Sequence, residues 1–186
     1  MSSASSFFVR WRVRTGYFVA IAVLWFAHPS VVSILCGAAI GLLGLIVRAS
    51  AAGHLHKQEV LADSGPYAYT RNPLYFGSSL LALGAAVAMR SWISAALLAA
   101  YFSVFYWAVM RREELELRQR HGAKFDAYAD AVPLFFPRMT AAANSVPVTF
   151  SLAQYKKNRE WRAALGFLLL LAILYARGQV RLPFSG

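Results

Sequence analysis

Arg71 is the residue of this sequence whose surroundings most favour a chemical role. It lies in the stretch 64–77, which holds two prolines, two glycines and three tyrosines between two long apolar runs. Gly-Pro and Asn-Pro dipeptides favour turns, because proline fixes its own φ and keeps the preceding residue out of the helical region. A guanidinium held in so constrained a loop can orient a carboxylate or polarise a reacting oxygen. A lone arginine before an apolar run is also typical of an anchor at the membrane interface.

Two adjacent carboxylates, Glu113 and Glu114, follow a later apolar run. Glu114 lies four residues before Arg118, and Glu116 lies four residues before Arg120, so the spacing favours ordinary ion pairs along one helix. Those pairs do not include Glu113. Neighbouring carboxylates repel each other unless a cation lies close. A ligand that carries an ammonium or sulfonium group fits this position as well as a solvated helix does.

The other polar residues give weaker signals. His54 and His56 are two residues apart and do not share a helical face, so a metal site is not expected. The tyrosines of the loop suit either an interface belt or a cage around a cation. The sequence contains no GxGxxG, Walker, GxSxG or HExxH motif, so phosphate loops, serine hydrolases and zinc proteases find no support.

The composition indicates that the elements holding these residues lie in a membrane. Hydrophobic residues make up 59% of the 186 residues and charged residues 15%, against about 45–50% and about 25% in soluble domains. The single cysteine, Cys36, excludes an internal disulfide framework. The first apolar run has no convincing cleavage site, so no cleavable signal peptide is expected.

The apolar runs predict an all-α polytopic membrane protein of one domain, 1–186, with about five transmembrane helices. Pro29 divides the first long run into a hairpin of helices at 13–27 and 31–51, and a span needs about 20 residues. Further spans are expected at 74–89, 92–110 and 163–176, and the charged segment 111–132 is expected to form two short helices that break at Gly122. Gly37 and Gly41 form a GxxxG pair, which predicts close helix packing. The chain then consists of an N-terminal hairpin (13–51), a core (53–138), and a C-terminal basic segment with the last apolar helix (151–177).

The basic residues predict the orientation of these helices. With the N-terminus in the cytoplasm, every lysine and arginine except Arg90, Arg177 and Arg181 falls on the cytoplasmic side, as the positive-inside rule requires. The net charge of +11 then faces anionic lipid headgroups of the inner membrane, and nucleic acid is not needed to explain it. The polar segments 53–73 and 111–138 emerge on the same side, which predicts an active site at the cytoplasmic face.

The loop around Arg71 resembles a known family signature. The isoprenylcysteine carboxyl methyltransferases and the related phospholipid methyltransferases carry the pattern G-x-Y-x-x-x-R-H-P-x-Y-x-G, and the chain has Gly65-Pro66-Tyr67-Ala68-Tyr69-Thr70-Arg71-Asn72-Pro73-Leu74-Tyr75-Phe76-Gly77. Residues 61–64 are similar to the lead-in of that pattern. Its second half, E-E-x-x-L…G-x-x-[YF]-x-x-Y…V-P…P, is matched by Glu113-Glu114, Leu117, Gly122, Tyr128, Val132-Pro133 and Pro137. The resemblance covers about 53–138.

The resemblance implies an integral-membrane enzyme that transfers a methyl group from S-adenosylmethionine to a lipidic or prenylated acceptor taken from the bilayer. Arg71 would be the catalytic arginine, and Glu113 would act beside it. The cofactor-binding positions implied in the same way are His54, Lys57, Leu61, Gly65, Tyr67, Asn72, Pro73, Tyr75, Gly77, Glu113 and Glu114.

Asn72 departs from the family pattern, which has histidine after the arginine. Asparagine donates and accepts hydrogen bonds but takes up no proton near pH 7, so it cannot act as a general base. A carboxylate acceptor needs no base, which slightly favours carboxyl O-methylation over phospholipid N-methylation. Two other readings remain: an NADPH-dependent sterol-type membrane reductase, whose R-x-P-x-Y-x-G block is similar, and a membrane scaffold without catalytic activity.

Overall fold

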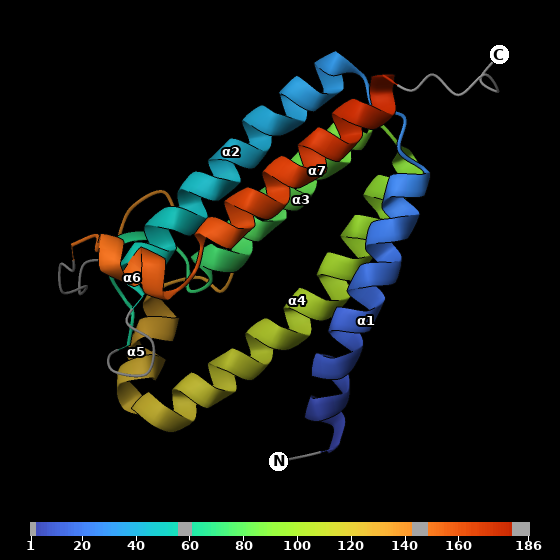
Figure 1. Cartoon of the computed structure of the whole chain (residues 1–186). Helices are drawn as coiled ribbons and strands as arrows, with labels where there is room; N and C mark the ends of the chain where they lie inside the picture. The colour runs from blue at the N-terminus through green and yellow to red at the C-terminus, as the bar shows by residue number, and fades with distance from the viewer. Residues whose placement is uncertain (1–2, 56–60, 143–148, 180–186) are drawn as a thin grey trace. The chain divides into compact units, whose positions relative to one another are not determined.

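The computed structural model describes residues 3–55, 61–142 and 149–179, and all the regular structure in these residues is helical (Figure 1). The α-helices are α1 (Ser3–Trp25), α2 (Val31–His54), α3 (Pro73–Met89), α4 (Trp92–His121), α5 (Ala123–Ala131), α6 (Leu152–Lys157) and α7 (Trp161–Gln179). One 3₁₀ turn, η1 (Gly65–Ala68), lies within the loop that contains Arg71. The prediction of an all-helical chain is confirmed.

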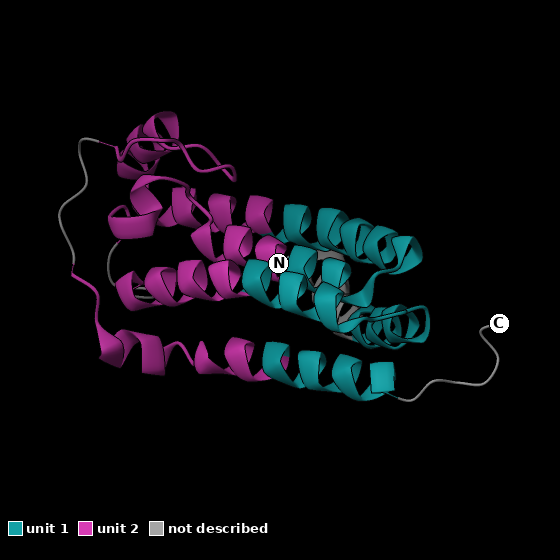
Figure 2. Cartoon of the chain, turned by 90° about the horizontal axis from the view of Figure 1, so that it is seen from above, with its two compact units in different colours: residues 1–41, 82–109, 167–186 teal, residues 42–81, 110–166 magenta. Residues whose placement is uncertain are grey.

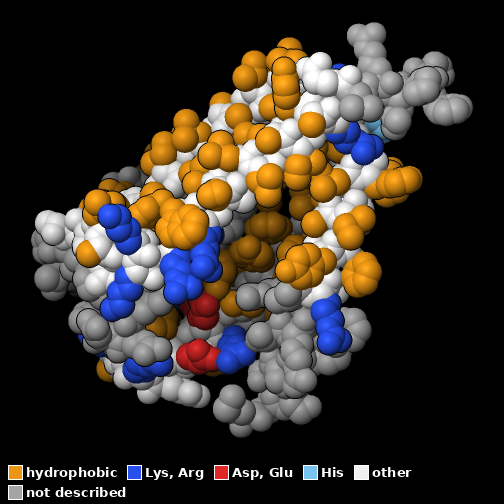
Figure 3. All heavy atoms as spheres, viewed as in Figure 1, with side chains coloured by type: hydrophobic (Ala, Val, Ile, Leu, Met, Phe, Trp, Pro, Cys, Tyr) orange, Lys and Arg blue, Asp and Glu red, His pale blue; other side chains and the backbone are white. Residues whose placement is uncertain are grey.

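Three helices, α2, α4 and α7, are long and apolar enough to cross a membrane. Two shorter apolar helices, Arg14–Trp25 within α1 and Pro73–Met89, lie where the sequence predicts further spans. Hydrophobic side chains cover the visible outer surface of α2 and α7 (Figure 3), and Leu35 and Leu168 are both more than 60% exposed. Such a surface suits lipid as its solvent. The number of five spans stays a prediction.

Helix α4 differs from the expectation. The sequence predicts a span that ends near residue 110 and a separate short helix after it, whereas α4 continues unbroken to His121. The segment after Met110 consists of good helix formers such as Glu, Leu, Arg and Gln, so nothing interrupts the hydrogen-bond ladder where the polarity changes. The predicted break at Gly122 is confirmed, because this glycine has a φ of 52° and separates α4 from α5.

The chain divides into two compact units (Figure 2). The first comprises residues 1–41, 82–109 and 167–186. Within it, a Cβ atom added at Gly37 would lie 2.3 Å from the carbonyl oxygen of Gly84, and one at Gly41 would lie 2.1 Å from the ring of Phe167. The predicted close packing of the GxxxG helix is therefore confirmed, since a side chain at either position would force its neighbours to shift.

The second unit comprises residues 42–81 and 110–166 and contains every described residue that the sequence singles out for chemistry. Here Gly44 and Gly77 bring α2 and α3 together, since a Cβ atom at Gly44 would lie 2.6 Å from the carbonyl oxygen of Gly77. Phe125 of α5 and Val132 after it are almost completely buried. The organisation as a single domain stays a prediction.

Candidate functional site

The loop that contains Arg71 begins with a turn that only glycine can make easily. Gly65 has a φ of 58°, and a Cβ atom there would lie 2.5 Å from the imidazole of His54. Pro66 then opens the 3₁₀ turn, in which Tyr67 and Ala68 are buried. The ring of His54 covers Gly65, while its Nδ1 donates to the carbonyl of Ser50 at 2.8 Å. Backbone conformation and local packing together fix the start of the loop.

The loop is held in place by hydrogen bonds to main-chain atoms of the segment 133–142. The backbone N–H of Arg71 donates to Pro133 O at 2.9 Å, and that of Arg138 donates to Tyr69 O at 3.0 Å. The Oγ1 of Thr70 donates to Phe135 O at 2.9 Å. The side-chain amide of Asn72 donates to Leu134 O at 3.0 Å. Asn72, which is buried, thus connects the loop to this segment by a neutral hydrogen bond.

The guanidinium of Arg71 is held on two sides. One Nη lies 3.0 Å from Oε1 of Glu114, and the other donates to Ala129 O at 3.2 Å. The side chain is only 15% exposed. Its Nε is buried and has no hydrogen-bond partner. A buried donor without a partner costs free energy, and a ligand oxygen that reached this atom would offset that cost.

The two carboxylates at the start of the charged part of α4 have different partners. Glu114 lies between Arg71 and Arg111, at 3.0 and 3.2 Å. Glu113 accepts a hydrogen bond of 2.6 Å from the hydroxyl of Tyr75 on α3. The expected pairing of Glu114 with Arg118 is wrong as a description of the structure, because the 3.0 Å contact with the loop arginine supplies a more buried partner. Arg118 instead lies 2.7 Å from a carboxylate oxygen of Asp126, and Glu116 lies 2.8 Å from Arg112.

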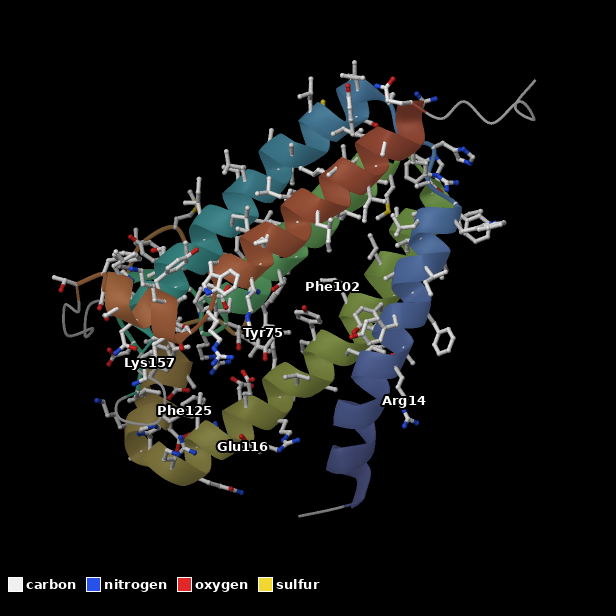
Figure 4. All side chains as sticks on the ribbon, in the orientation of Figure 1. Arg14, Tyr75, Phe102, Glu116, Phe125 and Lys157 are labelled. Atoms are coloured by element: carbon white, nitrogen blue, oxygen red, sulfur yellow. The ribbon has the colours of Figure 1, made fainter. Side chains whose placement is uncertain are left out.

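These side chains line a cavity of about 580 Å³ in the second unit, within the ordinary range for small-molecule sites. Three lining residues, Tyr75 of α3, Glu116 of α4 and Phe125 of α5, are labelled in Figure 4. The lining is chemically mixed. It consists of Arg48, Leu55, Leu61, Ala62, Tyr67, Arg71, Asn72, Pro73, Leu74, Tyr75, Glu113, Glu114, Glu116, Leu117, Arg120, His121, Phe125 and Tyr128.

Most of the site residues expected from the sequence meet at this cavity. Its lining includes Leu61, Tyr67, Arg71, Asn72, Pro73, Tyr75, Glu113 and Glu114. Three others lie outside that lining: Gly65 and His54 pack on each other, and Gly77 packs against the backbone of α2 and the stem of Arg48. Lys57 lies outside the described residues. Glycines of a sequence pattern can thus serve the site by making room for its walls.

Arg48 is a functional candidate that the sequence reasoning missed. It projects from α2 into the cavity lining and forms a two-pronged ion pair with Glu160, with a shortest distance of 2.7 Å. The available signal was a single arginine within a helix apolar enough to span a membrane, since charged residues in such helices are costly and usually functional. Glu160 lies in a basic segment beyond the family signature, so no pattern connected the two.

The buried Tyr67 and the half-buried Tyr128 add neutral hydrogen-bonding groups. Burial raises the pKa of Tyr67 far above its ordinary value, and the nearby phenol of Tyr128 and carboxylates of Glu113 and Glu160 add to this effect. Burial likewise raises the pKa of Tyr128, against the opposing influence of Arg71. Both therefore remain protonated phenols at neutral pH. The hydroxyl of Tyr128 donates to Tyr67 O at 2.8 Å and so braces the 3₁₀ turn.

In the part of the chain that the structure describes, no group of three or more His, Cys, Asp or Glu side chains is arranged to hold a metal ion. The donor set of the cavity is instead made of single carboxylates, each next to an arginine or a tyrosine. Such an arrangement suits an organic ligand that carries both positive and negative groups.

Comparison with known proteins gives two relatives over 102 residues, or 55% of the chain. It is 32% identical to the nickel-cobalt-cadmium resistance protein NccN of Alcaligenes xylosoxydans xylosoxydans. It is 33% identical to the cobalt-zinc-cadmium resistance protein CzcN of Cupriavidus metallidurans. In each case the matched region covers 47% of the relative, so the chain spans about half the length of these proteins. No solved structure matches the chain.

A family model gives broader coverage. The model of the phospholipid methyltransferase family matches residues 15–124, more than half of the chain. This range contains the Arg71 loop, α3 and the glutamate pair of α4, which all contribute to the cavity lining, whereas Phe125 and Tyr128 of α5 lie beyond it. The helices long and apolar enough to span a membrane agree with a family of membrane methyltransferases. The chain belongs to the phospholipid methyltransferase family.

Proposed function

We propose that the protein transfers a methyl group from S-adenosylmethionine to a lipidic or prenylated acceptor at the cytoplasmic face of the inner membrane. The observation that carries the proposal is Arg71, whose buried Nε lacks a partner and which lines a cavity together with Glu113 and Glu114. The family of the chain supplies the reaction class.

The chemistry of the lining fits S-adenosylmethionine. This cofactor carries a sulfonium, an ammonium, a carboxylate, ribose hydroxyls and a flat adenine ring. Carboxylates such as Glu113 suit the cationic groups and the hydroxyls, and the buried Tyr67 and Phe125 offer apolar ring surfaces.

S-adenosylmethionine, when bound, would supply an electrophilic methyl group on sulfur. The transfer neutralises charge, so the protein contributes chiefly by holding the reactants in line and excluding water. Glu114 and the carbonyl of Ala129 fix the plane of Arg71, which can then hold an acceptor oxygen. Tyr75 fixes the carboxylate of Glu113 across the cavity.

Asn72 slightly favours a carboxylate as the acceptor. Its amide is engaged with Leu134 O, and an amide takes up no proton at neutral pH. A carboxylate attacks without losing a proton, whereas an ammonium acceptor must first be deprotonated. We therefore favour carboxyl O-methylation over N-methylation.

Ligand binding to the purified protein tests the proposal. Isothermal titration calorimetry in detergent micelles should give a micromolar dissociation constant for S-adenosylmethionine or S-adenosylhomocysteine, and both should raise the unfolding temperature. NADPH, the cofactor of the alternative reductase, should do neither. The absence of heat and of a thermal shift with both nucleosides would refute the proposal, and protection by NADPH alone would favour the reductase.

A further inference from the structure

A second, smaller cavity of about 190 Å³ lies in the same unit as the candidate site. Its apolar wall is formed by Leu45, Ile46 and Ala49 of α2 and by Ala164 of α7. Its polar wall is formed by Arg48, Glu160 and Tyr155. Both helices are apolar enough to cross a membrane, and Ile46 is 56% exposed on the outer surface of α2. The cavity is therefore amphiphilic and lies where lipid can reach it.

Arg48 belongs to the linings of both cavities. One side of its guanidinium, Nε and one Nη, donates to the two carboxylate oxygens of Glu160 at 2.7 to 3.0 Å. The other Nη donates to Leu74 O at 3.2 Å and also to the hydroxyl of Ser78. The guanidinium thus has one side fixed by α3 and one side paired with a single carboxylate.

The position of Arg48 depends on a glycine of the family signature. A Cβ atom at Gly77 would lie 2.6 Å from Cγ of Arg48. The missing side chain therefore makes room for the arginine stem between α2 and α3. Gly77 serves the cavity through this contact, although it does not line the cavity itself.

Glu160 is brought to Arg48 by the junction between α6 and α7. Arg159 has a φ of 56°, in the left-handed region that a residue with a side chain seldom adopts. The side chain of Asn158 donates to the carbonyls of Ala52 and Leu55 at the end of α2, at 2.9 and 3.1 Å. Asn158, Arg159 and Glu160 lie beyond the range of the family match, which ends at residue 124.

We propose that the smaller cavity admits the carboxylate end of a lipid-like acceptor, which binds Arg48 in place of Glu160. The inference rests on the proposed methyl transfer and names its acceptor class as an acidic amphiphile. In the free protein the Glu160 carboxylate binds Arg48, and in the complex the acceptor's carboxylate takes its place. The acyl or prenyl chain then lies along Leu45 and Ile46, in contact with the bilayer.

The geometry of the guanidinium supports this exchange. An arginine binds a carboxylate through two parallel N–H···O bonds, and any carboxylate of suitable reach can form them. Removal of Glu160 leaves the bonds to Leu74 O and Ser78 in place, so the guanidinium keeps its orientation. An acceptor held there is next to the larger cavity, since Arg48 also lines that cavity.

Glu160→Gln tests the exchange, because it removes the competing charge and nearly preserves the shape of the side chain. Binding of palmitate, and of hexadecanol as the uncharged counterpart, is measured by calorimetry in detergent micelles. The variant should bind palmitate about tenfold more tightly than the wild type, since a hydrogen-bonded charge no longer competes, and should bind hexadecanol unchanged. Arg48→Lys should weaken palmitate binding by a similar factor, because lysine lacks the planar fork.

Asp126→Asn is the matched control, because it breaks another ion pair of the same unit, with Arg118, that lines neither cavity. It should change neither affinity. Unchanged or weaker palmitate binding by folded Glu160→Gln would overturn the inference. If that variant fails to fold, Arg48→Lys is the deciding variant. Palmitate affinity equal to that of the wild type would overturn the inference, and weaker binding of palmitate with unchanged binding of hexadecanol would support it. A wild-type protein that ignores S-adenosylmethionine but shows these palmitate effects would refute the methyltransferase proposal and leave the carboxylate site standing.

Discussion

At the scale of single residues, the two walls of the larger cavity differ in what fixes their charges. Arg71 is fixed by a carboxylate of α4 and by a backbone carbonyl of α5. Glu113 is held by a phenol of α3. The first arrangement leaves a buried N–H group for a ligand, and the second holds a negative charge next to a neutral donor. This asymmetry suits a reaction between a cationic donor and an anionic acceptor.

Arg71→Lys should reduce kcat by at least about a hundredfold, as does the loss of a well-placed donor in other active sites. Lysine keeps the positive charge but lacks the Nε–H group and the planar fork. The dissociation constant of S-adenosylmethionine should change by less than about threefold, which is below 1 kcal/mol, because we assign Arg71 to the acceptor oxygen. Steady-state kinetics and calorimetry separate the two effects. Wild-type turnover in the variant would identify Arg71 as a membrane anchor only.

Tyr75→Phe removes the hydroxyl that donates to Glu113 at 2.6 Å. We expect S-adenosylmethionine to bind about five- to tenfold more weakly, or by about 1.0–1.4 kcal/mol, because Glu113 loses the hydrogen bond that orients its carboxylate. Titration calorimetry measures the affinity. Tyr175→Phe on α7, an exposed side chain, should leave it unchanged. Equal affinities in both variants would remove Glu113 from the cofactor site.

Tyr128→Phe should flatten the alkaline loss of stability. Because burial raises the pKa of Tyr128 above the ordinary value of 10.0, the folded state binds a proton that the unfolded state releases above pH 10. Stability is thus complete below pH 10 and falls as pH rises above it, by up to about 1.4 kcal/mol per pH unit for each such tyrosine. Denaturant unfolding between pH 8 and 12 should show a shallower decline in the variant. At pH 8 the variant should be about 1 kcal/mol less stable, because the bond to Tyr67 O is lost.

At the scale of elements, the loop residues 68–72 and the segment 133–142 form the frame of the site. Six hydrogen bonds join them, three between backbone atoms and three from the side chains of Thr70 and Asn72. The frame gives Asn72 a structural role, because its side-chain amide donates to Leu134 O. Val132, next to this segment, and Phe125 are both almost completely buried.

Gly65→Ala and Gly122→Ala form a matched pair for the loop geometry. Both glycines have positive φ, 58° and 52°, but only Gly65 has a neighbour in the way, the imidazole of His54. Gly122→Ala should cost about 1–3 kcal/mol from backbone strain alone, because a φ of 52° with a ψ of −131° is a combination that favours glycine. Gly65→Ala should cost at least about 1 kcal/mol more, since the ring must also move. Thermal unfolding of both variants measures the difference. Equal losses would mean that His54 does not fix the turn.

The helices were predictable because apolar runs and breakers fix them locally. Pro29, the Arg90-Ser91 turn and Gly122 end helices close to where the sequence places them. Position in the signature predicted less well which residues line the cavity. Gly65 and Gly77 of the signature, and His54 before it, pack behind the cavity, whereas Arg48 lines it. The Arg48–Glu160 pair joins residues 112 positions apart. Local periodicity cannot predict an ion pair between residues so far apart in the sequence. The pairing of Glu114 with Arg71 could not be predicted for the same reason.

At the scale of the whole molecule, the distribution of basic residues makes a topological prediction. Trp92, before the fourth predicted span, should face the outside, and Met139 should face the cytoplasm. Both side chains are over 90% exposed. In a Cys36→Ser background, an impermeant maleimide should label Trp92→Cys in intact cells and Met139→Cys only after lysis. Labelling in the reverse order would place the candidate site on the outer face.

The main-chain anchoring of the Arg71 loop has a consequence for directed evolution. The side chains of Thr70 and Asn72 donate hydrogen bonds to the backbone carbonyls of Phe135 and Leu134. A backbone carbonyl is present whatever side chain its residue carries. Codon randomisation at 134 and 135 can therefore vary the surroundings of the loop while its anchors persist. Libraries built there would search for new acceptor preferences without dismantling the scaffold, whereas randomising Thr70 or Asn72 would remove the anchors themselves.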